Sequence, residues 1–134
     1  MKVIKCNVGK SKFAFPLGDI KEVIETVLYE EYLGQNKFTL GFINYRGDEL
    51  QLLNIAKVLK GAYEKNKEYE DRFIIIAKSQ PFCILVDNVE DIFDLEDEEI
   101  EKMVKESPFF KDGQTTLKRS ESGFTFVNYN FETD

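Results

Sequence analysis

Histidine and tryptophan are absent from this 134-residue sequence, which has only two cysteines and three prolines. Without histidine the chain lacks the commonest general base near neutral pH and the commonest nitrogen ligand of zinc. Cys6 and Cys83 form no Cys-x-x-Cys pair, and a thiol nucleophile would have no histidine partner. These absences argue against thiol catalysis and a structural metal site, and we expect no metal and no cofactor.

Long apolar runs and glycine-rich phosphate loops are also missing. The apolar runs span a few residues, whereas a membrane helix needs about 20. No segment has the spacing of a P-loop or a dinucleotide-binding loop, and no secretory apolar region follows residues 1–6. We therefore expect a cytoplasmic protein, in which Cys6 and Cys83 are reduced core residues.

Basic residues are fewer than acidic residues, 18 against 25, which gives a net charge of −7. This charge repels phosphate backbones and anionic membranes, so we expect no nucleic acid and no membrane insertion. A barrel that binds single-stranded nucleic acid is opposed by the charge and by the lack of a basic groove pattern. The length and the 43% hydrophobic content favour one domain, residues 1–134, with a protein partner.

Apolar patterns in the first 27 residues predict a hairpin followed by a helix. Alternation over 4–8 and 13–17, separated by Gly9-Lys10, predicts two strands and a tight turn. Asp19 with Glu22 three residues later is typical of a helix cap, and the apolar residues from Ile20 to Val27 recur at i, i+3, i+4 and i+7. This spacing predicts a short amphipathic helix.

Further apolar patterns predict a mainly β fold with seven to nine strands and two or three short helices. Strands are predicted at 38–42, 50–55, 73–77, 82–86 and 124–131, with a short helix from Asp97. The charged stretch 64–71 predicts a surface loop, and we place the junction between two halves of the domain near 60–72. Closely spaced hairpins without long helices favour β-barrels over a parallel α/β sheet.

Acidic residues alternate with apolar residues between Asp87 and Asp97. A calcium site or a catalytic carboxylate pair is possible in principle, because such groups converge in space and not along the chain. The alternation fits the solvent-facing side of a strand better. We therefore predict that the acidic residues between Asp87 and Asp97 lie on the solvent-exposed face of a strand.

Arg46 stands in the polar turn between two predicted strands. A turn arginine is commonly just solvated. Alternatively, its planar guanidinium can offer two hydrogen bonds to a carboxylate on another protein.

Two segments resemble the motifs of CheW-like domains. Residues 41–47, Gly-Phe-Ile-Asn-Tyr-Arg-Gly, followed by the apolar strand 50–55, are similar to the family's Asn-Leu-Arg-Gly segment. Residues 84–92 resemble its Val-Asp-x-Val segment, and 13–24 resembles the family's start. The similarity covers almost the whole chain.

The sequence departs from the family pattern at several positions. Tyr45 stands where leucine is usual, and Gln51 and Asn54 stand where proline and aspartate are common. The sequence ends at Asp134, where most members continue into a helix. We expect a divergent or C-terminally short member, or a truncated sequence.

The resemblance implies a fold of two small five-stranded β-barrels that share a hydrophobic core, with a few short helices. It implies a non-catalytic adaptor, not an enzyme, that couples the cytoplasmic tip of a methyl-accepting chemoreceptor to a CheA-type histidine kinase. The kinase contacts are not assigned to residues. The alternative is a divergent barrel that binds a small ligand or another protein in a different signalling system.

The resemblance also implies a receptor-binding site in a groove between the barrels. Arg46 would be the polar contact, with Asn44 and Gly47 shaping its turn and Val89 lining the groove. Ile20 and Val23 would lie in the early helix that borders the groove. An exposed apolar groove beside Arg46 would favour an adaptor, and an enclosed polar pocket would favour a ligand-binding barrel.

Overall fold

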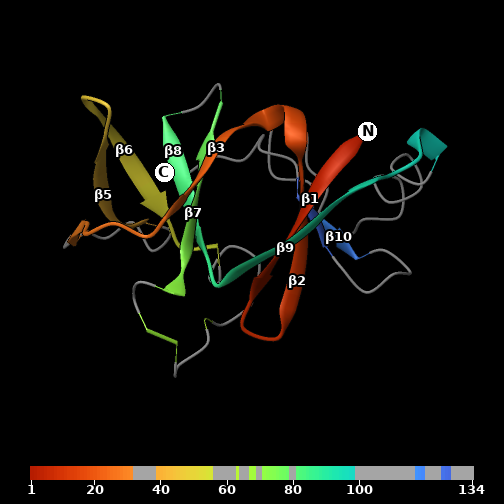
Figure 1. Cartoon of the computed structure of the whole chain (residues 1–134), viewed down its shortest axis with the longest axis horizontal. Coiled ribbons are helices and arrows are strands. Elements are labelled where there is room, and N and C mark those ends of the chain that lie inside the picture. Colours follow the sequence, from red (N-terminus) through yellow and green to blue (C-terminus); the bar gives the residue numbers. More distant parts are fainter. Residues whose placement is uncertain are drawn as a thin grey trace.

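The structure is a computed structural model that describes residues 1–31, 39–55, 63, 67–68, 71–78, 81–98, 117–119 and 125–127. These residues form eleven strands in two sheets, together with the 3₁₀ turn η1 (Leu17–Asp19). None of the helical segments in this part of the chain has the length and hydropathy of a membrane span. The expected mainly β architecture is confirmed (Figure 1).

The first sheet combines the two ends of the chain. Its strands, in spatial order, are β10 (Leu117–Arg119), β11 (Thr125–Val127), β2 (Ser11–Pro16), β1 (Lys2–Val8) and β9 (Asn88–Asp94). The predicted hairpin of β1 and β2 is confirmed, with Gly9 in the turn at a φ of 60°. Strand β11 falls within the predicted strand 124–131, whereas β10 lies in a polar segment for which no strand was predicted.

The second sheet is built from the middle of the chain. Its strands, in spatial order, are β3 (Ile20–Glu25), β7 (Phe73–Ala77), β8 (Phe82–Val86), β6 (Asp48–Leu53), β5 (Thr39–Tyr45) and β4 (Glu30–Glu31). The predicted β5–β6 and β7–β8 hairpins are confirmed as antiparallel pairs. The β6 and β8 strands run parallel and join the two hairpins into one sheet.

The predicted helix from Ile20 is wrong, because this segment is strand β3. Its register with β7 shifts between Ile20 and Glu22, where β3 carries one extra residue. The bulge turns both Ile20 and Val23 toward the same hydrophobic cluster. An i, i+3 spacing therefore arises in a strand and imitates a helical face, although valine and isoleucine themselves favour extended backbone.

The chain crosses between the sheets at η1 and again at Asp87, between β8 and β9. The predicted junction near 60–72 lies mostly outside the described residues, and in chain order it stands between β6 and β7. Most of the helix predicted from Asp97 falls outside the described residues.

Both sheets contribute to one hydrophobic cluster, as the shared core requires. Its buried members are Ile4, Cys6, Val8, Phe13 and Phe15 from the first sheet and Leu53, Ile55, Ile75, Ala77, Phe82, Ile84 and Val86 from the segments of the second. In β7, Ile75 faces this shared cluster, whereas Ile74 and Ile76 face a second cluster on the other side of the sheet. Burial on both faces explains the continuous apolar run of β7.

The two thiols are free and buried, which confirms the expected core cysteines. Burial raises the pKa of the Cys6 thiol from its ordinary 9.0 to about 12, and the negative charge of Glu90 adds to this effect. Burial alone raises the pKa of the Cys83 thiol from 9.0 to about 12. The folded state therefore holds both thiol protons more tightly than the unfolded chain does.

We expect these thiols to stabilise the fold below pH 9.0 and to lose that contribution as the pH rises toward about 12. Each thiol adds a slope of about 1.4 kcal/mol per pH unit to this loss. Urea denaturation between pH 8 and 11 measures it, with the Cys6→Ala/Cys83→Ala variant as the control for lysine and tyrosine titration. Equal slopes in the two proteins would contradict the prediction.

Candidate functional site

The turn of the β5–β6 hairpin has two residues, Arg46 at a φ of 51° and Gly47 at 88°. Positive φ at both positions defines the type I′ turn, whose twist matches the flanking strands. The Asn44 side-chain oxygen accepts a hydrogen bond from the Gly47 backbone N–H at 3.1 Å. Arginine is uncommon at positive φ, so Arg46 at the first turn position is a candidate for a functional role.

The Arg46 side chain is oriented and accessible at the same time. A terminal guanidinium nitrogen donates to Oε2 of Glu22 in β3 at 3.1 Å, and the guanidinium lies over the Tyr45 ring at 5.1 Å. The side chain is nevertheless 67% exposed. An exposed ion pair of this kind contributes little stability, but it presents the remaining N–H groups in a defined direction.

Tyr45, a buried residue at the end of β5, connects the hairpin to β3. Its hydroxyl donates to the same Glu22 carboxylate, and its ring packs in the second hydrophobic cluster. The hydrogen bond to Glu22, followed by burial, raises the pKa of Tyr45 above its ordinary value. These contacts join β3 and β5, which lie toward opposite ends of the sheet order. The second sheet therefore curls toward closure, as a barrel requires.

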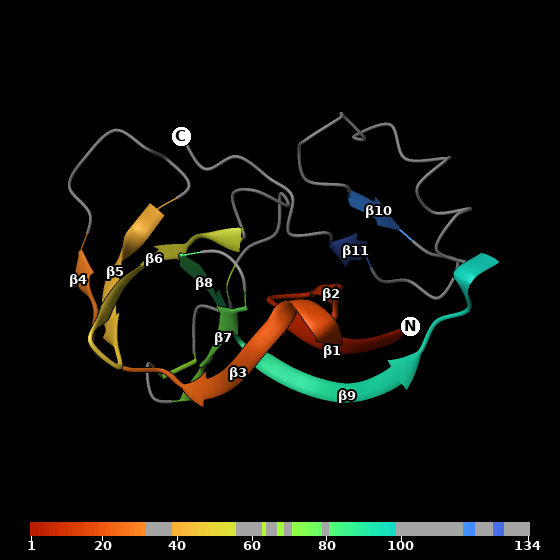
Figure 2. The ribbon, with the colours of Figure 1, turned by 90° about the horizontal axis from the view of Figure 1, so that it is seen from above.

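The predicted apolar site residues pack on the shared core. Ile20, Val23 and Val89 are each half-buried against the shared cluster. Strands β3 and β9, which carry them, run along the same side of the molecule (Figure 2). Asn44, Arg46 and Gly47 form the hairpin turn, and Glu22 links that turn to β3. Asn44, Arg46 and Gly47 thus lie together at the turn, and Ile20, Val23 and Val89 lie together against the shared cluster. The two groups are on opposite faces of β3, because Glu22 meets Tyr45 on the side of the second cluster.

Sequence reasoning missed two residues next to these groups, Glu22 beside the turn and Ile92 on the strand of Val89. Glu22 was interpreted as part of a helix cap, and its partners lie about two dozen residues away in the hairpin. Ile92 is 54% exposed. A register shift in β9 pairs Val89 with Cys6 and Ile92 with Ile4, so both β9 residues lie on one face. Ile92 therefore extends the apolar surface beside Val89.

The segment after β3 exposes two more apolar side chains. Val27 is 40% exposed and Leu28 is 90% exposed. Exposed apolar side chains are common on soluble proteins and indicate a docking surface only where they gather into a patch.

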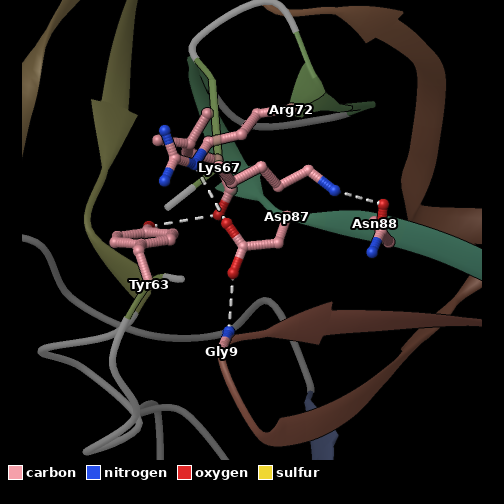
Figure 3. A network of polar contacts seen from close by, with 7 residues as sticks. Gly9, Tyr63, Lys67, Arg72, Asp87 and Asn88 are labelled. Atoms are coloured by element: carbon pink, nitrogen blue, oxygen red, sulfur yellow. Dashed lines mark hydrogen bonds and ion pairs between the residues drawn. The ribbon is translucent and has the colours of Figure 1, made fainter. Parts of the chain in front are cut away.

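Asp87 does not lie on the wet strand face that the sequence predicted. It is 1% exposed, and its carboxylate accepts from Arg72 Nε at 2.9 Å and from the Gly9 backbone N–H at 2.6 Å (Figure 3). The local alternation of acidic and apolar residues could not reveal these distant donors. By contrast, Asp91 and Asp94 are exposed as predicted. Within the described ranges, no group of three or more potential metal ligands comes together.

Two sheets with a shared core, and a hairpin arginine held beside β3, define a small two-sheet β-domain. The CheW-like domain family matches residues 2–121, and the chain belongs to this family. The crystal structure of the scaffolding protein TtCheW from Thermoanaerobacter tengcongensis has a similar fold, with a TM-score of 0.75 and 17% sequence identity. The similarity covers 99% of this chain and 93% of that chain. No curated protein sequence matches the chain.

Proposed function

We propose that this protein is a non-catalytic adaptor that couples methyl-accepting chemoreceptors to a CheA-type histidine kinase in chemotaxis. The observation that carries the proposal is the orientation of Arg46, held by Glu22 beside an edge strand at a two-residue turn. Membership of the CheW-like family supports a scaffolding role. The scaffolding protein of similar fold supports the same role.

The receptor's cytoplasmic tip would dock along β3 and β9. Arg46 would bond a receptor carboxylate with the N–H groups that Glu22 leaves exposed. Ile20, Val23 and Val89 are half-buried, so they would form the floor of the contact, and the more exposed Ile92 would supply accessible apolar area. Apolar burial around one polar anchor is how such interfaces obtain most of their affinity.

The mechanism would be geometric. The adaptor would hold kinase and receptor in fixed positions, so that a change in the receptor alters the kinase through the two interfaces. An adaptor of this kind needs no catalytic group of its own. The kinase contacts stay unassigned to residues.

Val89→Lys tests the receptor surface. We expect capture of a receptor cytoplasmic fragment to fall about tenfold or more, because the lysine places a charge where apolar contact is needed. Capture of the kinase regulatory domain should stay unchanged. Asp94→Lys is the control, since it introduces the same side chain at an exposed position of the same strand. Partners should come from the same organism, and circular dichroism should verify folding.

Failure of the folded wild-type chain to capture either partner would contradict the adaptor. That outcome would favour the divergent barrel and a search for small ligands. Equal loss in Val89→Lys and Asp94→Lys would place the receptor elsewhere on the surface.

A further inference from the structure

Asp87 occupies the point at which the chain passes from the second sheet to the first. It follows β8 directly and precedes β9. Its backbone N–H donates to the Asn7 carbonyl oxygen at 2.8 Å, which ties the crossing to the end of β1. The chain therefore leaves the second sheet at this buried residue, which determines the direction in which β9 continues.

The Asp87 carboxylate binds one donor from each side of the crossing. Oδ2 accepts from Gly9 N–H, in the β1–β2 turn of the first sheet, at 2.6 Å. Oδ1 accepts from Nε of Arg72, the residue directly before β7 of the second sheet, at 2.9 Å. The side chains of Asp87 and Arg72 are 1% and 16% exposed, so the charges interact largely out of water. We call Asp87, Arg72 and Gly9 the latch.

Two residues between β6 and β7 contact the chain before and after Asp87. The Tyr63 hydroxyl donates to the Leu85 carbonyl oxygen in β8 at 3.1 Å, and Lys67 Nζ donates to the Asn88 side-chain oxygen in β9 at 2.6 Å. Figure 3 shows the two side chains beside the latch. The last residues of β8 and the first residue of β9 are thus held together with Asp87.

A buried ion pair of this kind is a weak source of stability, because desolvation offsets much of the attraction between the charges. Buried polar pairs can instead specify one arrangement of the chain. Here the arrangement concerns two sheets joined at only two crossings among the described residues. Val89, the proposed groove residue, stands two positions after Asp87.

From these contacts we infer that Asp87 and Arg72 are positioning residues, which fix the orientation of β9 against the second sheet and thereby place Val89 for receptor docking. The placement of Val89 for receptor docking rests on the proposed function. The orientation of β9 against the second sheet is a property of the isolated chain and is measured without the receptor. Neither residue is proposed to touch the receptor.

Asp87→Asn tests the latch with little change of shape. An amide presents one acceptor and one donor group, so it cannot accept from both Gly9 N–H and Arg72 Nε through its two ends. We expect residual dipolar couplings of the isolated chain to report a changed angle between the two sheets, with shifted amide signals at Val89. Receptor capture should fall about tenfold, the size of a typical coupling between sites.

Ile75→Val is the matched control, since it loosens the shared core without touching the latch. The couplings and amide signals of each variant are measured at the same number of degrees below its own melting temperature. Lys67→Met, which removes a peripheral contact, provides a milder second variant if Asp87→Asn does not fold. It should shift the Val89 amide in the same direction by a smaller amount.

Unchanged couplings and an unchanged Val89 amide in Asp87→Asn would overturn the inference. Equal changes in Ile75→Val would also overturn it, because they would show a general effect of instability. A wild-type chain that captures no receptor would instead overturn the proposed function. The couplings of the isolated chain would still decide whether the latch orients β9.

Discussion

Replacement of Phe15 by alanine is expected to lower the free energy of unfolding by about 3–5 kcal/mol. Phe15 lies in β2, is 0% exposed and packs in the cluster shared by both sheets. The lost contacts and the cavity both contribute to the cost. Since typical domains are stable by about 5–15 kcal/mol, this single change removes a large share.

The shared core also predicts that both sheets unfold together. Cys6 reports on the first sheet and Cys83 on the second, because both thiols are buried in the native state. In urea, both should become reactive toward a thiol reagent at one midpoint, and Phe15→Ala should lower that midpoint for both. Lys12→Ala is the control, because Lys12 lies in the same strand and its exposed ion pair with Glu90 contributes at most about 1 kcal/mol.

Separate midpoints for the two thiols would contradict the shared core. A loss of protection confined to Cys6 would mean that the first sheet unfolds alone.

Arg46→Glu is expected to weaken receptor capture by about tenfold or more while leaving the melting temperature nearly unchanged. The substitution removes the proposed contact and places two carboxylates, at 22 and 46, near each other. The exposed ion pair that it breaks is worth about 0–1 kcal/mol. Binding titrations with the receptor fragment and thermal unfolding measure the two effects separately.

Three matched variants separate the possible causes. Arg46→Gly keeps the turn, because glycine accepts the positive φ, but it removes the guanidinium. Lys10→Glu makes the same type of charge change on the exposed turn of the other hairpin. The double variant Glu22→Arg/Arg46→Glu restores an ion pair with reversed direction.

A direct receptor contact by Arg46 predicts weak capture for Arg46→Gly and for the double variant, and normal capture for Lys10→Glu. Recovery of capture in the double variant would assign the pair a positioning role instead. Normal capture by Arg46→Glu would remove Arg46 from the site.

Strands and turns were predictable where local patterns decide them. The alternation of β1 and β2 around Gly9 and the polar residues before Gly47 indicated both hairpins. The continuous apolar run of β7 indicated a strand. The position of Arg46 on a hairpin turn followed from the same patterns. Its contact with Glu22 depends on how the second sheet brings β3 and β5 together.

The errors arose where distant parts of the chain decide the structure. A bulge in β3 reproduced the spacing of a helical face at Ile20 and Val23, and only pairing with β7 distinguishes the two. Asp87 was placed on a wet face because Gly9 and Arg72, its donors, are remote in sequence. The crossing at Asp87 itself could not be inferred, because the charged composition of 64–71 is the stronger local boundary signal in the sequence.

The proposed coupling is tested most directly by co-sedimentation of the kinase regulatory domain with receptor-containing membranes, with and without this protein. An adaptor role predicts that the regulatory domain sediments with the membranes only when the folded chain is present. Arg46→Glu should reduce this recruitment, and Lys10→Glu should not. Equal sedimentation of the regulatory domain with and without the chain would contradict the adaptor role.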